Sequence, residues 1–265
     1  MSLMQRIKDH VVPPGNVMLW WLGQNGFIFK SPAGTTLGID LYLTDSCEGL
    51  HPEINLKRQI PVLIEPEDLD IDLFFCTHNH QDHTDPETIR RVARKNTTRF
   101  VGPMPSCEIF RLEGVAKENI VPAWPASEIT FKDLLLRGTF ALPTDDSDLN
   151  HMGVVAQFER GPKIYITGDT DYHELVASAA KHKPDVMIVC INGGFNNLSH
   201  WEAAQLAALV KPRIAIGCHY DMFPDNSVDP QQFRAALALK APAVQFVQLK
   251  HGTPFLVPAP PLEVA

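Results

Sequence analysis

Short apolar runs, each broken by glycine or proline, dominate the first third of the chain. Runs of this length that are rich in Val, Ile, Trp and Phe predict β-strands. The segments concerned are 17–22, 26–29, 36–39 and 71–76. The last of them, IDLFFC, is continuously apolar, which is typical of a strand covered on both faces. A helix is predicted next over 86–94, because this segment opens with a proline and keeps its apolar residues on one side.

The pattern changes in the second half of the chain. Strands are predicted near 100–101, 129–131 and 134–142, followed by a hairpin of 153–158 and 163–167. After residue 169, helical segments (172–181, 200–209, 230–239) alternate with strands (186–191, 214–217, 244–249). Such alternation predicts crossover units that cover a sheet. We therefore expect an αββα sandwich, two sheets face to face with helices outside, in a single domain over 1–265. We interpret residues 1–3, which precede a second methionine, as an expression leader outside this fold.

Composition narrows the class of protein. With 45% hydrophobic and 20% charged residues, the chain has an ordinary globular composition. Its formal charge of −8 and the lack of a basic run argue against nucleic acid and anionic membranes as partners. No stretch approaches the roughly 20 apolar residues of a membrane span. The N-terminal segment lacks a secretory signal and the five cysteines lack CxxC spacing, so we expect a cytoplasmic protein with free thiols.

The histidines are unevenly distributed. Three of the eleven fall within six positions, in the segment THNHQDH at 77–83, directly after the predicted buried strand. A loop that leaves a strand can direct alternating side chains into one cavity, and imidazoles with a carboxylate suit a divalent metal. We expect His78 and His80 to hold one ion, while Asp82 and His83 reach toward a second.

Two further candidate ligands also follow predicted strands. Asp169 comes after the strand at 163–167, where a carboxylate can bridge two ions, and His219 follows the strand at 214–217. An aspartate in such a position is often only a helix cap, and a histidine after a strand is often a core residue. Because three strand ends carry ligand-type residues, we favour one divalent metal centre that holds one or two ions.

These residues form a recognisable set. The motif HxHxDH at 78–83, the triplet GDT at 168–170 and the late His219 resemble the metallo-β-lactamase superfamily, whose fold is an αββα sandwich. The blocks WWLGQ at 20–24, GIDLY at 38–42 and HYDMFP at 219–224 are similar to its L-ascorbate-6-phosphate lactonase branch, in which manganese activates the water that opens a sugar lactone. The resemblance implies Mn²⁺ or Zn²⁺ as cofactor. The ligands it implies are His78, His80, Asp82, His83, Asp169 and His219.

One position departs from the superfamily pattern. Many members place another histidine ahead of the GDT strand as the third ligand of the first ion, and here that region is LPTDDSDLNH at 142–151. Asp146 lies nearest the expected place, Asp145 is adjacent, and His151 is an alternative. A carboxylate is a harder ligand than imidazole, so Asp146 would favour manganese.

The sequence also supports a hypothesis for the reaction. Since neither a GxSxG motif nor a P-loop is present, water is the expected nucleophile, with Asp82 or Asp169 orienting it or taking its proton. We expect a hydrolase that opens a lactone, such as that of a phosphorylated sugar acid, with a small anionic substrate and a homo-oligomeric state. A phosphodiesterase and a non-hydrolytic metal-binding module are the alternatives.

Four residues are predicted to contact the substrate. Backbone N–H groups around Asn192 and Gly193 could cradle an anion, although a plain glycine turn explains them equally well. Tyr220 and Asp221 stand beside His219 and are predicted to bind substrate or to orient ligands. Asp40, at the end of its strand, is expected to orient a ligating histidine.

Overall fold

Two seven-stranded sheets form the centre of the molecule in the computed structural model, which describes residues 1–146 and 149–259. The strand order of the first sheet is β14 (Phe255–Val257), β1 (Val17–Gly23), β2 (Gly26–Lys30), β3 (Thr36–Ile39), β4 (Leu73–Phe75), β5 (Arg99–Gly102) and β6 (Ile120–Pro122). The order of the second is β13 (Gln245–Val247), β12 (Ile214–Cys218), β11 (Val186–Cys190), β10 (Lys163–Ile166), β9 (Met152–Phe158), β8 (Leu134–Phe140) and β7 (Glu128–Phe131). The end of the predicted domain, 260–265, lies outside the described residues.

Each sheet is antiparallel in one half and parallel in the other. The first runs parallel from β3 to β6, and the second from β10 to β13. Parallel strands end at the same edge of a sheet, and β9 begins at that edge because it pairs antiparallel with β10. The predicted hairpin of β9 and β10 is confirmed, and its geometry brings the start of β9 beside the end of β10.

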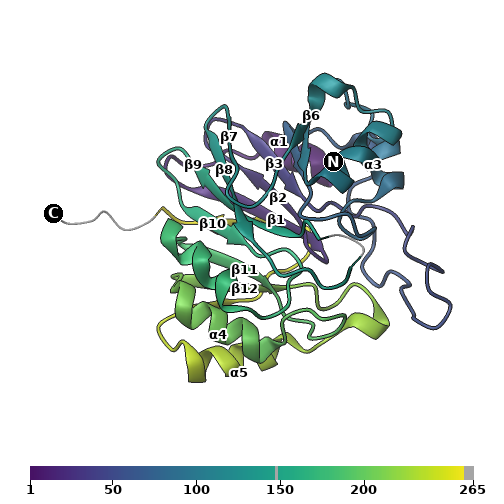
Figure 1. The fold of residues 1–265 in the computed structure, drawn as a ribbon. Helices are drawn as coiled ribbons and strands as arrows, with labels where there is room; N and C mark the ends of the chain where they lie inside the picture. The colour runs from purple at the N-terminus through teal and green to yellow at the C-terminus, as the bar shows by residue number, and fades with distance from the viewer. Residues whose placement is uncertain (147–148, 260–265) are drawn as a thin grey trace.

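Helices cover the outer faces of both sheets (Figure 1). On the side of the first sheet lie α1 (Leu3–Asp9), α2 (Pro86–Arg91) and α3 (Met104–Leu112), and on the side of the second lie α4 (His200–Val210) and α5 (Pro230–Lys240). Short 3₁₀ helices complete the chain at η1 (Pro66–Asp68), η2 (Lys117–Asn119), η3 (Glu174–His182) and η4 (Pro224–Asn226). The predicted αββα sandwich is confirmed, with one large apolar core that includes the space between the sheets.

Some local predictions were wrong. Residues 1–3 do not all stand outside the fold, because the Ser2 side chain caps α1 and Leu3 is only 6% exposed. The segment predicted as a helix over 172–181 is the 3₁₀ helix η3. The helix α3 was not predicted, since Pro103 and Pro105 flank its first residue and are typical of a loop.

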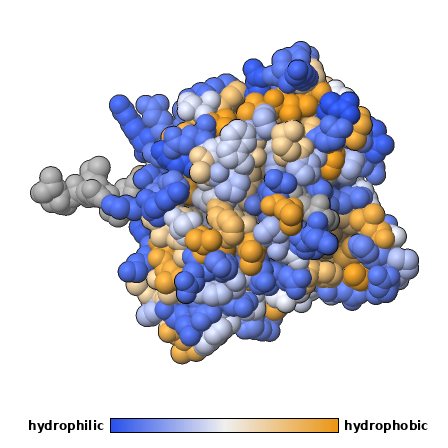
Figure 2. All heavy atoms as spheres, in the orientation of Figure 1, coloured by the Kyte–Doolittle hydropathy of each residue, from blue (hydrophilic) through white to orange (hydrophobic). Residues whose placement is uncertain are grey.

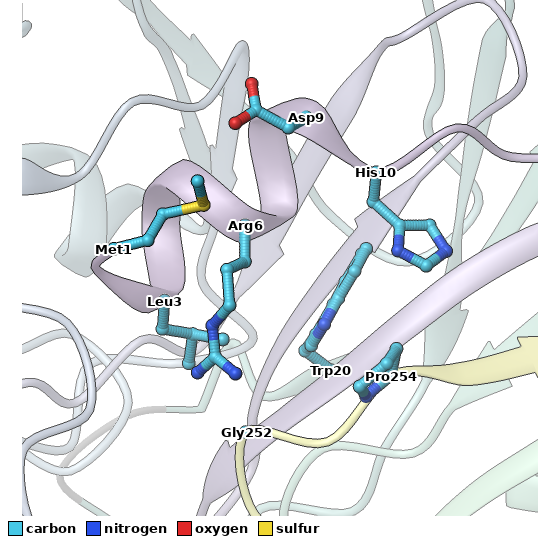
Figure 3. Close-up of a pocket in the computed structure, with 8 residues that line it drawn as sticks. All are labelled: Met1, Leu3, Arg6, Asp9, His10, Trp20, Gly252 and Pro254. Carbon is cyan, nitrogen blue, oxygen red and sulfur yellow. The ribbon is translucent and has the colours of Figure 1, made fainter.

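The helix α1 is held to the first sheet by a buried ammonium group. Lys30 Nζ donates to the carbonyl oxygens of Ile7 and His10, both at 2.9 Å, and to that of Lys8. These carbonyls lie at the C-terminal end of α1, where a cation is favourable. Beside the helix is a hollow of about 350 Å³, over which the rings of His10 and Trp20 meet edge to face (Figure 3). The N-terminal helix is therefore an integrated part of the sandwich.

The face shown in Figure 2 mixes hydrophilic side chains with separate, small hydrophobic patches. Such mixing is ordinary for the surface of a globular protein. Within the described ranges, we find no helix of the length and apolar character needed to cross a membrane.

Candidate metal centre

The predicted ligands meet where strands of both sheets end or begin. The segment 78–83 follows β4, His151 precedes β9, Asp169 follows β10 and His219 follows β12. The backbones are closely packed at this point. A Cβ on Gly168, whose φ is +62°, would lie 2.9 Å from Thr77 Cβ and 3.0 Å from the Met152 carbonyl oxygen, so only glycine fits. The glycine of the GDT triplet thus lets the two sheets converge on one site.

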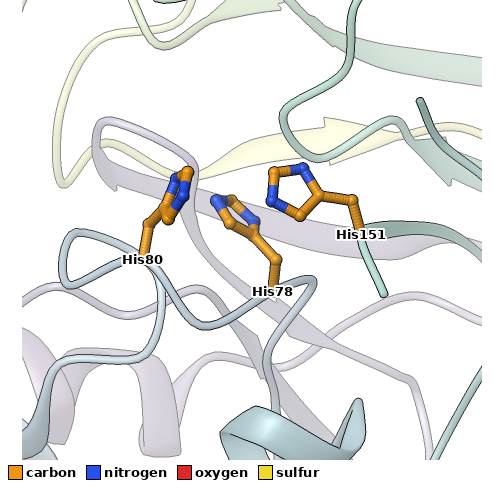
Figure 4. A group of neighbouring side chains, drawn as sticks. All are labelled: His78, His80 and His151. Carbon is orange, nitrogen blue, oxygen red and sulfur yellow. The ribbon is translucent and has the colours of Figure 1, made fainter. Parts of the chain in front are cut away.

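Potential ligand atoms form three overlapping groups within the described part of the chain, and in each group these atoms lie within 4.8 Å of one another. The first group, whose rings turn toward one another in Figure 4, is His78, His80 and His151. The second is His78, His83 and Asp169, and the third is Asp82, His83 and His219. The second group shares His78 with the first and His83 with the third, so the ligand atoms form one connected cluster that suits one or two divalent ions.

Asp40 orients a ligating histidine through the ring nitrogen that faces away from the centre, as predicted. This fully buried carboxylate accepts hydrogen bonds from Asn25 Nδ2 (2.6 Å), from the Thr77 backbone N–H (2.7 Å) and from the Thr77 hydroxyl (2.7 Å). Its Oδ2 also lies 2.8 Å from His83 Nδ1. Because a carboxylate only accepts, His83 carries its proton on Nδ1 and directs Nε2 into the centre.

The hydroxyl of Thr77 extends this arrangement to a second ring. It lies 3.0 Å from His78 Nδ1 and, having donated its proton to Asp40, it accepts the proton of that nitrogen. The Nε2 atom of His78 is buried and has no hydrogen-bond partner among the described residues. A buried acceptor nitrogen beside two other imidazoles fits a bound metal ion.

The third group is held by a glutamine that the sequence did not single out as a site residue. Gln24 Nε2 lies 2.6 Å from Asp82 Oδ2 and 2.8 Å from His219 Nε2. That His219 nitrogen is also 3.3 Å from Asp82 and 3.2 Å from Asp169 Oδ2. Gln24 directly follows β1, so the available signal was a polar residue after the apolar run of a strand, the same signal that indicated Asp169 and His219.

Opposite charges dominate the electrostatics of the metal-free centre. Burial alone would lower the pKa of His83 and His219, but the carboxylates of Asp169 and Asp82 raise the pKa of His219 to about 9 and that of His83 well above its ordinary value. Despite burial, the two histidines hold the pKa of both carboxylates below the usual range. Burial and neighbouring imidazoles lower the pKa of His78. A metal ion would replace the protons on His83 and His219, so binding should release protons.

The loop before β9 supplies a histidine in place of the predicted aspartate. Asp146 is exposed and belongs to none of the three ligand groups, so its prediction as a ligand is corrected. His151, the alternative, takes the third position of the first group because Met152 N–H donates to the Thr77 carbonyl and fixes the start of β9 beside the HxH segment. Asp145 lies 3.1 Å from His80 Nε2.

The predicted substrate contacts lie elsewhere. Tyr220 packs against Trp21, with ring centroids 5.2 Å apart, and Asp221 Oδ2 lies 3.1 Å from His251 Nε2, in a separate hollow. The N–H of Gly193 donates to the Leu198 carbonyl and is not available to an anion. None of these residues lines the cavity at the metal centre.

Asn192 and the asparagines near it instead support the centre. The Asn192 amide donates to Asn226 Oδ1 at 2.7 Å, and Asn226 lines the cavity and lies 3.4 Å from His219 Nδ1. Asn197, which the sequence did not indicate, donates to Asp169 Oδ2 at 2.7 Å. The loop after β11 therefore positions ligands, and the predicted role of Asn192 in binding an anion is not supported by its contacts.

A cavity of about 380 Å³ opens onto the ligands. Its lining includes His80, Asp82, Asp169 and His219. The volume suits a small organic molecule, and the ligands lie in its wall where a substrate can reach them. Most of the residues predicted as ligands therefore lie together, and the structure adds the shape of the space around them.

Comparisons with known proteins identify the family of this chain. The model of a family described as "Beta-lactamase superfamily domain" matches residues 18–219. The "Probable L-ascorbate-6-phosphate lactonase UlaG" of Salmonella choleraesuis is 23% identical over 96% of this chain and 82% of that protein. Among solved structures, a metallo hydrolase from Ignicoccus hospitalis has a TM-score of 0.71 at 19% identity, covering 91% of this chain and 98% of the other.

An isothiocyanate hydrolase from Delia radicum gut bacteria has a TM-score of 0.73 at 17% identity, covering 90% of this chain and 98% of its own. At these identities the solved structures support the fold alone. The family match spans most of the chain and includes the ligand segment, Asp169 and His219. The chain therefore belongs to the metallo-β-lactamase superfamily.

Proposed function

We propose that this metallo-β-lactamase-fold hydrolase opens a lactone ring with water, using one or two divalent ions. The observation that carries the proposal is the convergence of three overlapping ligand groups on one small cavity, whose wall includes Asp82, Asp169 and His219. The 23% identity to a lactonase over nearly the whole chain supports a cyclic ester as the substrate class. Manganese and zinc both suit a donor set of imidazoles and carboxylates.

The protein's own groups divide the work. When bound, a divalent ion polarises the carbonyl oxygen and lowers the pKa of water from 15.7 to about 7. Asp82 lines the cavity with its side chain 18% exposed, so its ionised carboxylate can orient the attacking water and take its proton. Asp169 accepts a hydrogen bond from the Asn197 amide. Its oxygens lie 3.3 Å from His83 Nε2 and 3.2 Å from His219 Nε2, so this carboxylate helps to fix both rings.

The reaction balances without a further reactant. Water adds to the carbonyl carbon, the ring C–O bond breaks, and the proton taken by the carboxylate passes to the departing alkoxide. The product is a hydroxy acid, whose release of a proton to solvent can be followed directly.

A pH-stat measures this proton release from γ-butyrolactone, with the spontaneous rate subtracted. Turnover should require Mn²⁺ or Zn²⁺, disappear with EDTA and return when metal is added. His80→Ala and Asp169→Ala should abolish turnover and keep the far-UV circular dichroism spectrum. Asp72→Asn is a matched control, because Asp72 bonds Thr36 at the start of β3 and the metal centre lies beyond the end of that strand. This variant should keep the turnover and the circular dichroism spectrum of the wild type. Wild-type rates in either ligand variant would refute the site assignment.

The alternatives give different results in the same preparation. Cleavage of bis-p-nitrophenyl phosphate without lactone turnover would identify a phosphodiesterase. Tight metal binding without either activity would identify a non-hydrolytic metal-binding module.

A further inference from the structure

We propose that the cavity takes a substrate whose group next to the scissile bond is apolar and uncharged, in place of the phosphorylated sugar acid expected from the sequence. The inference rests on the proposed function, because it concerns the substrate of the same centre. Apolar side chains form part of the cavity lining, and three of them, Cys47, Leu56 and Phe223, belong to one apolar cluster. The apolar lining residues are Cys47, Leu50, Leu56, Phe195 and Phe223.

The charge of the lining disfavours a phosphate group. No lysine or arginine is among the described residues that line the cavity, and residues 147–148 and 260–265, outside the described ranges, include none in the sequence. The nearby Arg58 is absent from the lining, and its guanidinium donates to the carbonyl oxygens of Ile60, Tyr42 and Thr44. A phosphate carries about −1.5 to −2 charges at pH 7 and is usually held by arginine or lysine.

The charged side chains that do line the cavity beyond the centre add to this effect. Asp145 is half exposed at the cavity, beside His80. A second anionic group on the substrate would meet this carboxylate, and no lysine or arginine of the described lining would compensate the repulsion. An uncharged group avoids that repulsion and loses little by leaving water.

Phe195 is presented to the cavity by an unusual backbone. It is 49% exposed, and both Phe195 (φ +55°) and Asn196 (φ +57°) adopt the left-handed conformation, which asparagine tolerates but which is unfavourable for phenylalanine. Asn196 Nδ2 donates to the Thr144 carbonyl at 2.8 Å, and Asn197 is tied to Asp169. These bonds maintain the unfavourable backbone and keep a large apolar ring at the wall of the metal site.

The segment between β3 and β4, together with Phe223 after β12, contributes the remaining apolar wall. Leu50 is 46% exposed in the cavity lining, and Leu56 is half-buried there. Phe223 packs against Tyr42, with ring centroids 5.9 Å apart, and is fixed in place. Exposed leucine and phenylalanine side chains that share one small cavity can bury an alkyl or aryl group of a ligand.

The test compares two lactones that differ only in the alkyl group beside the ring, and adds a phosphorylated sugar lactone as a third substrate. A methylene group that becomes fully buried on binding should raise kcat/KM about fourfold, and one that packs against the half-exposed wall of this cavity should raise it about twofold. The five additional methylenes of γ-nonalactone should therefore raise kcat/KM about 30-fold over γ-butyrolactone. 6-Phosphogluconolactone should be turned over no better than γ-butyrolactone.

Variants test the role of Phe195 itself. Phe195→Ala should lower the ratio of kcat/KM for γ-nonalactone to kcat/KM for γ-butyrolactone at least fivefold, and Phe195→Leu should retain most of the wild-type ratio. Leu239→Ala, an exposed leucine on α5 far from the lining, should leave the ratio unchanged. An unchanged ratio in Phe195→Ala, or a preference for the phosphorylated lactone, would overturn the inference.

Binding distinguishes failure of this inference from failure of the proposed function. The metal-loaded protein is titrated calorimetrically with the ring-opened products 4-hydroxynonanoate, 4-hydroxybutyrate and 6-phosphogluconate. Tighter binding of the nonanoate, weakened by Phe195→Ala, supports the apolar site even if no lactone is hydrolysed. Equal binding of the two hydroxy acids, tighter binding of the phosphogluconate, or no binding of the nonanoate at millimolar concentration would refute it.

Discussion

Asp40 offers a direct test of how the histidines are oriented. In Asp40→Asn, an NH₂ group replaces one oxygen of a carboxylate that accepts hydrogen bonds through both oxygens. At the Oδ2 position this NH₂ group would face three donors, the Asn25 amide, the Thr77 hydroxyl and His83 Nδ1. The amide nitrogen will therefore take the Oδ1 position, where it faces only the Thr77 N–H. Asp40 has φ +45°, which asparagine tolerates as well as aspartate, so the change adds no backbone strain.

The magnitude follows from these contacts. The buried Thr77 N–H loses its acceptor. The hydrogen bonds to Oδ2 change from charge-assisted to neutral, which roughly halves their strength. Because the cost of burying the charge also disappears, we expect the free energy of unfolding to fall by about 2 kcal/mol. Loss of a carboxylate behind a ligating histidine should weaken metal binding 10- to 100-fold.

Urea unfolding of the metal-free protein, followed by circular dichroism, measures the stability term. Competition with a fluorescent chelator at pH 7.5 measures metal affinity. Asp72→Asn is the control, since Asp72 also accepts from a threonine of the first sheet but lies away from the centre, and its metal affinity should stay within twofold. A folded Asp40→Asn protein with wild-type metal affinity would refute the reasoning.

Three further predictions concern the third ligand, pH and the N-terminal helix. His151→Ala should lower metal affinity at least tenfold while Asp146→Ala changes it less than twofold; equal losses in the same chelator assay would return Asp146 to the ligand set. In the metal-free protein the pKa of His219 is raised to about 9, so its charged form stabilises the fold fully below pH about 6.5 and this stabilisation is lost as the pH rises through 9. The urea concentration at the midpoint of unfolding should therefore fall between pH 6.5 and pH 9.5, and a midpoint that does not change with pH would contradict this. Lys30→Met should lower the free energy of unfolding by about 2 kcal/mol at pH 7 without changing metal affinity, because its ammonium bonds three carbonyls far from the site; weakened metal binding would show that α1 has another role.

The sequence predicted most of the centre because its ligands carry strong local signals. His78, His80 and His83 are dense in one segment, and Asp169 and His219 follow clear strands. The choice between Asp146 and His151 depended on the register at which β9 begins, which is set by its bond to Thr77 and has no local signature. Such a choice requires the tertiary contact itself.

Residues beyond the ligands were harder to predict. Tyr220 follows a ligand directly, but His219 adopts the left-handed conformation (φ +59°), which turns the next residues away from the cavity. Asn197 and Gln24 act through hydrogen bonds to residues distant in the chain, and nothing in their own segments indicates those partners. In the fold, α1 has only seven residues and depends on Lys30, a contact invisible to local periodicity.

The loop after β11 connects the metal ligand Asp169 to the wall of the cavity, so it can couple the binding of metal to the binding of a ligand in the cavity. Asn197 donates to the Asp169 carboxylate, and its neighbour Asn196 donates to the Thr144 carbonyl in the loop before β9. Phe195, the preceding residue, lines the cavity. A ligand that orders this loop must favour metal binding by the same factor by which metal favours the ligand, typically 5- to 150-fold. For such a ligand, the ion would be held more tightly while the cavity is filled than after the product departs.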